Sequence, residues 1–373
     1  MTNSNPIQSI IEHSADIPHA ARAIVPNLDG VRAMACLMVV LYHMPFPGKL
    51  EPLGATGVGI FFVLSGFLMS YLYARSHWDL NSIFCYGIAR AARIAPVYWL
   101  VVSICIVISY AEPNGNFVLQ IVGGQSIARH YLFGASTFIF WSIPPEIQYY
   151  IFFLVVWYAV ACRAKQPGVL ALLALLCAVL LLTHNLWPGL SLPKTLNLFL
   201  AGSIAGLVPR NIWTTCLEKR VLPYLQLAAL ALLLVPLWLY PSQPKLYEAS
   251  ELGLAIAVAV YLLSIPTRWT TFVFASPISR RIGRASFSIY LMHMLVFHFG
   301  ARWLGLSRET YDPLWLALGL AGVVLPMIAS RYVEIPLQRV TRRFLEAAIL
   351  PLVSRLSGAF PSGRIAPVET TQR

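Results

Sequence analysis

Charged residues are scarce in this sequence of 373 residues. Asp, Glu, Lys and Arg together make up 11% of the chain, whereas soluble globular proteins carry about 25%. Hydrophobic residues reach 58%, and the mean hydropathy is +0.69. These values argue against a soluble enzyme, a nucleic-acid-binding protein or a disordered protein as a description of the whole chain. They predict an all-α polytopic membrane protein.

The sequence also lacks the cysteine patterns of disulfide scaffolds and zinc sites. Its six cysteines form no C-x-x-C motif, and most of them lie in or beside apolar runs. Small buried hydrophobic side chains account for this placement better than covalent or metal-binding roles do. We therefore expect no metal site and no tightly bound cofactor.

Long apolar runs separated by short polar gaps dominate the chain. A membrane-spanning helix needs about 20 residues, and ten runs approach this length. They cover residues 28–46, 53–74, 94–111, 146–162, 168–184, 195–208, 222–240, 250–265, 286–304 and 313–333. We predict about ten transmembrane helices in one bundle.

The segments that flank these runs are more polar. We predict that residues 1–26 form a cytoplasmic N-terminal segment without the apolar stretch of a cleavable signal peptide. Residues 27–340 then form the transmembrane domain, and residues 341–373 form a basic cytoplasmic tail. The proline-containing chain after about residue 334 is predicted to be peripheral or loose.

The distribution of Lys and Arg predicts the orientation in the membrane. If the N-terminus lies inside, 20 of the 27 basic residues fall in cytoplasmic segments and 6 fall in outer loops, while Arg32 lies within the first run. Cytoplasmic loops of membrane proteins carry such an excess. The asymmetry predicts cytoplasmic N- and C-termini, and it explains the net charge of +12 without a nucleic-acid partner.

Three ionisable residues lie on one face of the first run. Asp29 and Arg32 are three positions apart, and His43 follows Arg32 by eleven, which returns to nearly the same direction at about 100° per residue. Arg32 and His43 would lie roughly 16 Å apart along the axis. One interpretation is that Asp29 and Arg32 cap the helix and His43 is an interfacial residue. We favour a functional site, because ionisable residues inside a span are costly.

Other polar residues recur at the ends of later runs. Arg90 and Arg93 have the spacing of cytoplasmic anchors, and their alternative role is phosphate binding. Glu146 follows Ser142, a candidate N-cap, and enters from the outer side toward which His43 also points. The two side chains are therefore a candidate acid/base pair. Ser65, in a glycine-containing run, is interpreted as a packing residue.

Six motifs in this order resemble the acyltransferase-3 family of membrane proteins over about residues 27–340. The motifs are Leu28-Asp29-Gly30-x-Arg32 followed by His43, Phe61-Phe62-Val63-Leu64-Ser65-Gly66-Phe67, Arg93-Ile94-x-Pro96-x-Tyr98, Trp141-Ser142-x3-Glu146-x-Gln148, Ser288-x-Tyr290-Leu291-x-His293 and Glu334-x-Pro336. The chain departs from the family pattern at Gly59, where an acidic residue is common, and at Pro144-Pro145.

The resemblance implies an O-acyltransferase, most simply an O-acetyltransferase, of a bacterial inner membrane. It implies a cytoplasmic acyl-coenzyme A donor and, as acceptor, a hydroxyl of a surface or exported polysaccharide or a glycolipid. It also implies three sets of site residues. The catalytic set is His43, Glu146, Arg32 and Asp29. The donor-binding set is Arg90, Arg93 and Arg284, and the substrate-binding set is Tyr150, Tyr290 and His293.

Several alternatives remain open at this stage. His43 is expected to act as a general base on the acceptor hydroxyl, with an acyl-histidine intermediate as the rival route. The acceptor alternatively is a macrolide-type small molecule. A transporter or flippase without chemistry is the rival class, because intramembrane charges also mark transport pathways. Apart from donor, acceptor and membrane lipids, no partner or oligomeric state is predicted.

Overall fold

The computed structural model describes residues 25–45, 51–113, 117–163, 166–187, 189, 191–209, 220–234, 249–307 and 309–359. Within these ranges the chain is helical, and no strand occurs among them. The helices are α2 (Pro26–Tyr42), α3 (Glu51–Tyr73), α4 (Leu80–Ala111), α5 (Gly124–Tyr131), η2 (Phe138–Ser142), α6 (Ile143–Cys162), α7 (Pro167–Leu182), η3 (His184–Leu186), α8 (Leu192–Leu207), α10 (Leu222–Leu232), α13 (Ser250–Ser264), α14 (Arg268–Phe274), α15 (Pro277–Arg284), α16 (Ser286–Leu304), α17 (Leu314–Ala329), η4 (Ser330–Glu334) and α18 (Ile335–Ala359).

The all-helical class is confirmed, but the count of ten spanning helices is not. Four helical segments of the described residues are long and apolar enough to cross a membrane, namely Pro52–Tyr73, Leu80–Ala111, Phe138–Cys162 and Leu314–Arg355. A fifth exists if α13 and α14, which meet at 102°, form one broken span. The expected spans 168–184 and 222–240 correspond to the shorter helices α7 and α10, and residues 235–240 lie outside the described residues.

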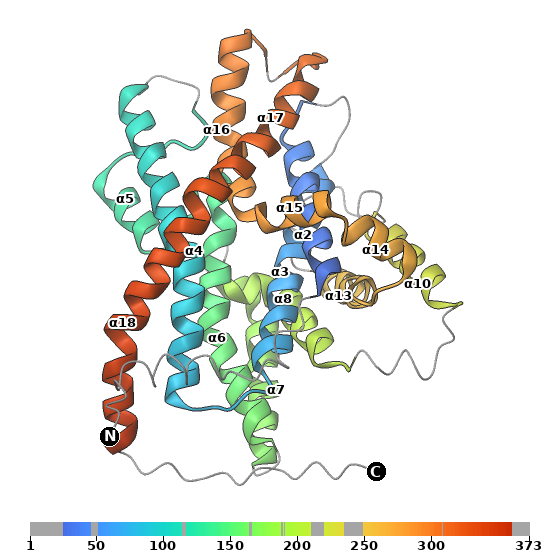
Figure 1. Cartoon of the computed structure of the whole chain (residues 1–373), viewed down its shortest axis with the longest axis vertical. Coiled ribbons are helices and arrows are strands. Elements are labelled where there is room, and N and C mark those ends of the chain that lie inside the picture. Colours follow the sequence, from blue (N-terminus) through green and yellow to red (C-terminus); the bar gives the residue numbers. More distant parts are fainter. Residues whose placement is uncertain are drawn as a thin grey trace, which may run out of the picture.

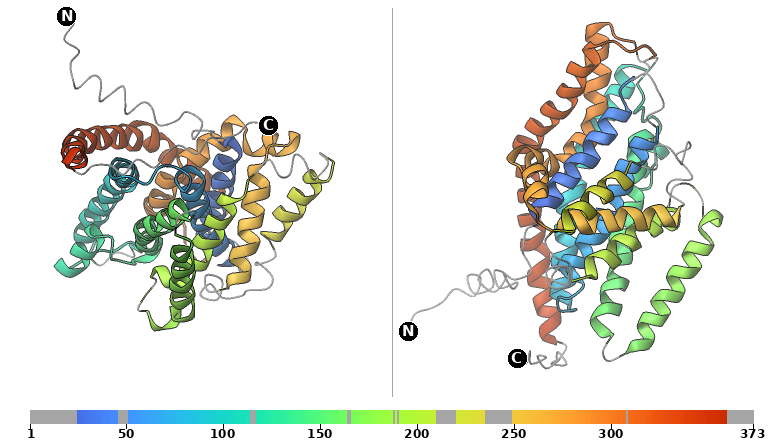
Figure 2. Two further views of the ribbon diagram at one scale, coloured as in Figure 1. Left: turned by 90° about the horizontal axis from the view of Figure 1, so that it is seen from below. Right: turned by 90° about the vertical axis from the view of Figure 1, so that its right-hand side faces the viewer.

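The elements that carry the candidate site cross in the middle of the molecule (Figure 1). Helix α3 packs against both α2 and α8, and α16 packs against α17. Helices α10, α13 and α14 lie on one side of this centre, whereas α18 runs along α4 on the other (Figures 1 and 2). Helix α7 is peripheral and buries none of its side chains.

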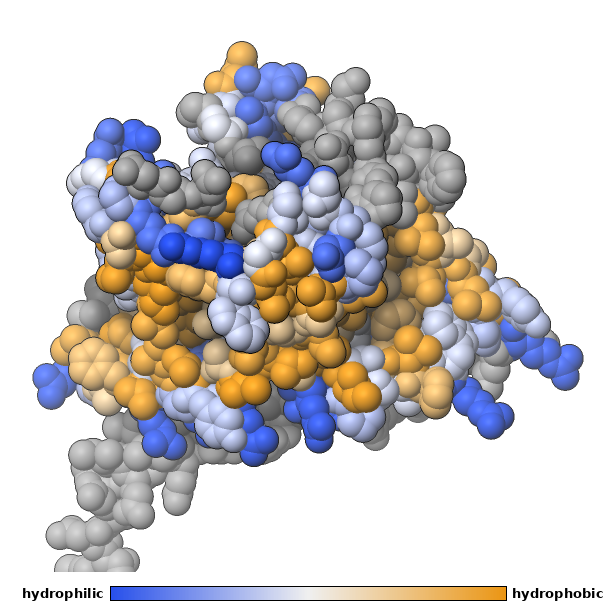
Figure 3. Space-filling view, turned by 90° about the horizontal axis from the view of Figure 1, so that it is seen from above, coloured by the Kyte–Doolittle hydropathy of each residue, from blue (hydrophilic) through white to orange (hydrophobic). Residues whose placement is uncertain are grey.

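Apolar side chains cover much of the surface. Seen from above, large apolar areas are interrupted by hydrophilic patches (Figure 3). Leu182, Phe272 and Trp303 are each more than 80% exposed. Such extensive apolar surface is incompatible with a soluble monomer. Together with the long apolar helices, it identifies an integral membrane protein.

Glycines allow the central helices to approach one another closely. A Cβ atom on Gly66 would lie 2.0 Å from the carbonyl oxygen of Phe199 on α8, and one on Gly202 would lie 2.0 Å from that of Val63 on α3. Gly30 meets the backbone of Phe274 in the same way. Small residues at membrane helix crossings allow this contact. The packing interpretation of the glycine run around Ser65 therefore holds for Gly66.

Helix α4 begins well before the predicted start of the third span at residue 94. Asp79 caps it, and the Asp79 side chain accepts a hydrogen bond of 2.9 Å from the backbone N–H of Ser82. The additional turns carry Arg90 and Arg93, whose charges ended the apolar run in the sequence. Because both arginines extend from a continuous helix, Arg93 can turn its side chain toward the centre of the molecule.

The chain after residue 334, expected to be peripheral or loose, forms helix α18 over residues 335–359 and packs along α4. Pro336 has no N–H and would clash with a regular preceding turn. A π-helical turn, Ser330–Glu334, precedes it and widens the backbone at this point. Ser288, Ser330 and Gln338 donate hydrogen bonds to the buried Glu334 carboxylate. The helix therefore continues past the proline, and residues 360–373 lie outside the described residues.

Candidate active site

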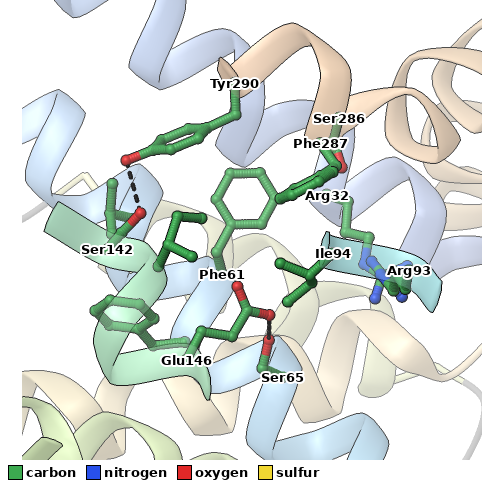
Figure 4. A pocket seen from close by; sticks show the side chains of 13 residues that line it. Arg32, Phe61, Ser65, Arg93, Ile94, Ser142, Glu146, Ser286, Phe287 and Tyr290 are labelled. Carbon is green, nitrogen blue, oxygen red and sulfur yellow. Dashed lines mark hydrogen bonds between the residues drawn. The ribbon is translucent and has the colours of Figure 1, made fainter. Parts of the chain in front are cut away.

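A cavity of about 50 Å³ lies between α2, α3, α4, α6 and α16, and we call it the arginine cavity (Figure 4). Its walls are formed by Arg32, Val58, Phe61, Phe62, Ser65, Arg93, Ile94, Ser142, Ile143, Glu146, Ser286, Phe287 and Tyr290. Most of these residues are apolar or aromatic, so the few polar side chains among them determine what the cavity binds.

Two arginines from different helices meet at one end of the arginine cavity. Arg32 extends from α2 and Arg93 from α4, and their guanidinium groups lie together (Figure 4). Among the described residues, no hydrogen bond or ion pair engages either guanidinium group. Two adjacent cations in an apolar surrounding favour an anionic or strongly dipolar ligand, and guanidinium groups suit phosphate and oxyanion geometry.

Glu146 supplies the only carboxylate among the described residues that line this cavity. Its Oε1 accepts hydrogen bonds from the hydroxyl groups of Ser65, at 3.0 Å, and Tyr150, at 2.6 Å. Tyr150 lies one turn along α6 and lines neither this cavity nor the one described next. It holds the carboxylate in place and does not itself face the space.

His43 lines a second cavity, of about 170 Å³, which we call the histidine cavity. The other residues of its wall are Val39, Tyr42, Gly54, Ala55, Val58, Phe138, Ile139, Trp141 and Tyr290. His43 is the C-cap residue of α2, so the end of this helix places the imidazole at the cavity wall. The histidine cavity shares Val58 and Tyr290 with the arginine cavity.

Hydrogen bonds fix the tautomers of two facing histidines. The Nδ1 of His293 lies 2.9 Å from the carbonyl oxygen of Ile289, so this nitrogen carries the proton and donates it. The Nε2 of neutral His293 is then an acceptor, 3.1 Å from Nδ1 of His43. That Nδ1 also lies 2.8 Å from the carbonyl oxygen of Val39. His43 therefore carries its proton on Nδ1 and its basic lone pair on Nε2.

The structure separates several residues that the sequence grouped. Asp29 turns away from Arg32 and accepts a hydrogen bond of 3.3 Å from Arg284, with Arg280 at 3.8 Å. This cluster joins the start of α2 to α15. Arg90 lies over the rings of Tyr73 and Tyr150 and lines neither cavity.

His43 and Glu146 also lie in different cavities. The structure therefore brings His43 to His293, and it brings Glu146 to Ser65 and Tyr150. The predicted roles of these side chains in catalysis remain predictions.

Two serines were assigned structural roles from the sequence but line the arginine cavity. Ser142 was expected to cap α6, yet its side chain makes no capping bond and donates instead to the Tyr290 hydroxyl at 2.8 Å. The helical turn η2 runs directly into α6, so Ser142 is not an extended N-cap. For Ser65, the spacing of positions 58, 61 and 65 places it on the helical face of the cavity residues Val58 and Phe61.

Three known proteins that are similar to this chain are each named as an O-acetyltransferase or a putative O-acetyltransferase. The peptidoglycan O-acetyltransferase OatA of Listeria monocytogenes is 24% identical over 360 residues, covering 86% of this chain and 56% of that protein. The putative peptidoglycan O-acetyltransferase YrhL of Bacillus subtilis is 25% identical and covers 72% of this chain and 48% of its own length. A putative O-acetyltransferase of Staphylococcus aureus is 24% identical, with 74% and 51% covered. The chain thus spans about half the length of these relatives.

No solved structure matches the chain significantly. The Acyltransferase domain family, in contrast, matches residues 25–331. This range contains both cavities and every residue of their walls. The chain therefore belongs to the acyltransferase-3 family.

Proposed function

We propose that this protein moves an acetyl group from cytoplasmic acetyl-coenzyme A to a hydroxyl of a carbohydrate on the outer side of a bacterial inner membrane. The observation that carries the proposal is the pair of adjoining cavities, one with two arginines and a carboxylate and the other with a basic imidazole. The relatives named as peptidoglycan O-acetyltransferases support a carbohydrate acceptor over a macrolide.

The arginine cavity suits the donor. Coenzyme A is polyanionic, and its thioester carbonyl develops negative charge when it is attacked. Arg32 and Arg93 would stabilise this charge from a cavity wall that is mostly apolar or aromatic. Arg280 and Arg284 lie beside Asp29, one turn before Arg32 on α2, and would give the entrance on this side a positive charge.

The histidine cavity suits the acceptor. The Nε2 lone pair of His43 would remove the proton of a sugar hydroxyl while its oxygen attacks the thioester carbon. A carbon–oxygen bond forms, the carbon–sulfur bond breaks, and the proton passes from His43 to the departing thiolate. In the rival route, Nε2 itself attacks the carbonyl carbon and transfers the acetyl group in a second step.

The orientation follows from the charge distribution. The excess of Lys and Arg in the expected cytoplasmic segments supports cytoplasmic N- and C-termini and about ten spans, counting shorter helices such as α7 and α8. In this orientation, the start of α2 with Arg32 lies toward the cytoplasm, and its end with His43 lies toward the outer side.

The proposal is tested by following labelled acetyl groups. Membranes that contain the protein receive acetyl-coenzyme A with a labelled acetyl group and a soluble glycan acceptor, and label on the glycan is counted. We expect transfer by the wild type and a loss of about 10²–10⁴-fold in His43→Ala, the range typical for removal of a general base. His298→Ala, a change on α16 outside both cavities, is the matched control.

Near-normal turnover of His43→Ala at equal protein amounts would contradict the role of His43. If the wild type transfers no acetyl group to any carbohydrate hydroxyl but moves an unmodified solute across the membrane, the result would favour a transporter.

A further inference from the structure

Only two residues belong to the walls of both cavities, among those that the structure describes. They are Val58 on α3 and Tyr290 on α16. Arg32, Arg93 and Glu146 lie on one side of this pair, and His43 lies on the other. Val58 and Tyr290 therefore form the partition between the two cavities.

Two hydrogen bonds and one ring contact hold the Tyr290 side chain in the partition. Its hydroxyl group donates a hydrogen bond of 2.7 Å to the carbonyl oxygen of Ile139 and accepts one of 2.8 Å from Ser142. Its ring meets the ring of Phe61 edge to face, with 6.4 Å between the centroids. The hydroxyl group loses both bonds if the side chain swings away about χ1, so the bonds hold the ring in the partition.

Val58 is equally constrained. Its side chain is 5% exposed, and a β-branched side chain on a helix has one strongly preferred rotamer. The helix that carries it cannot retreat, because the glycine contacts hold α3 against the backbone of α8. The width between Val58 and Tyr290 is thus set by two rigid groups.

The position of this partition has a consequence for the transferred group, provided that the proposed function holds. The thioester carbonyl has to come within reach of the histidine cavity, both when His43 activates a hydroxyl and when His43 attacks directly. The carbonyl carbon and its alkyl chain must therefore fit between Val58 and Tyr290. The bonds made and broken are those already described, and no further reactant is needed.

We propose that Val58 and Tyr290 form a size filter that restricts transfer to acetyl or a similarly short acyl group. Phe62 and Ile143, which line the arginine cavity, are each 2% exposed, and the cavity itself holds only about 50 Å³. Protein interiors are packed so densely that even one added methylene group has to displace neighbouring atoms.

The proposed size filter is tested by measuring which acyl groups the enzyme transfers and how fast. The rate of transfer is measured with acetyl-, propionyl- and butyryl-coenzyme A for the wild type, Val58→Ala and Val63→Ala. Val63 is the matched control, because it is a fully buried valine on the same helix that lines neither cavity. We expect the butyryl-to-acetyl ratio of kcat/KM to rise at least about tenfold in Val58→Ala, since one methylene in a pocket changes selectivity by roughly 10–200-fold.

The ratio is expected to stay unchanged in Val63→Ala. A second variant, Val58→Ile, narrows the partition and should lower the propionyl-to-acetyl ratio even if Val58→Ala fails to insert. Efficient butyryl transfer by the wild type, or ratios that do not move in either Val58 variant, would overturn the filter while acetyl transfer by the wild type keeps the proposed function intact. No acetyl transfer by the wild type would instead refute the function on which the filter rests.

Discussion

In the proposed function, the single charge of Glu146 organises the donor side of the site. It faces the two guanidinium groups of Arg32 and Arg93 across the arginine cavity, while Ser65 and Tyr150 hold its Oε1. Removing the carboxylate leaves two cations with no opposite charge on the cavity wall. Like charges in a medium of low polarity repel strongly, so this residue is expected to set the balance between binding and releasing an anion.

The substitution Glu146→Gln separates charge from hydrogen bonding. The amide oxygen still accepts from Ser65 and Tyr150, so the fold is preserved and the melting temperature should stay close to that of the wild type. Acyl transfer should fall severely, because the charge balance of the cavity is lost. Steady-state kinetics on membranes with equal amounts of protein measure this, and wild-type turnover in Glu146→Gln would remove Glu146 from the machinery.

His293 is expected to act through His43. Its Nε2 accepts from Nδ1 of His43 and so keeps the lone pair of His43 on Nε2. His293→Ala should lower kcat by less than His43→Ala does, because the Val39 carbonyl still accepts the same proton. His293→Gln offers an amide oxygen at this position and should recover part of the lost rate. Equal rates for the Ala and Gln variants would argue against orientation of His43.

At the scale of elements, the close contact between α3 and α8 fixes the position of the cavity residues on α3. A methyl group on Gly202 would meet the carbonyl oxygen of Val63 at 2.0 Å, and that atom belongs to backbone that has no room to move. Overpacking of this kind costs about 1–3 kcal/mol. We therefore expect Gly202→Ala to lower the melting temperature in detergent.

Gly168 provides the control for this prediction. It lies on the peripheral helix α7, and a Cβ atom there would meet nothing within 4 Å. Gly168→Ala should leave the melting temperature nearly unchanged. Equal effects of the two substitutions would show that the loss of glycine, and not the helix crossing, decides stability.

The sequence contained enough information to predict the helical class and several polar residues of the cavity walls, but not their grouping. Arg32, Glu146 and Tyr290 were recognised from charge and motif, and all three line the arginine cavity. The separation of His43 from Glu146 depends on how α2 and α6 each pack against α3, and residue spacing carries no information on this packing. The course of α18 was missed because Pro336 reads as a helix end unless a π turn precedes it.

The spanning helices were also only partly predictable. Hydropathy finds apolar runs, but it does not show that α13 and α14 meet at 102° or that α7 stays at the periphery. These features arise from packing between elements that lie far apart in the sequence.

At the scale of the whole molecule, the proposed orientation directs the two ends of α2 toward opposite sides of the membrane. Arg32 near its start and His43 at its end face different cavities that meet at Val58 and Tyr290. In the proposed function, the donor enters from the side of Arg32 and the acceptor from the side of His43.

The proposed cytoplasmic origin of the donor is tested by supplying acetyl-coenzyme A to one face of the membrane at a time. Labelled acetyl-coenzyme A, which does not cross membranes, is added either to inverted inner-membrane vesicles that expose the cytoplasmic face or to intact spheroplasts that expose the outer face. The acetyl label on carbohydrate is then measured for the wild type and for His43→Ala. We expect wild-type labelling from the inverted vesicles alone and none with His43→Ala. Equal labelling from both faces, or labelling from the spheroplasts alone, would contradict the cytoplasmic origin of the donor.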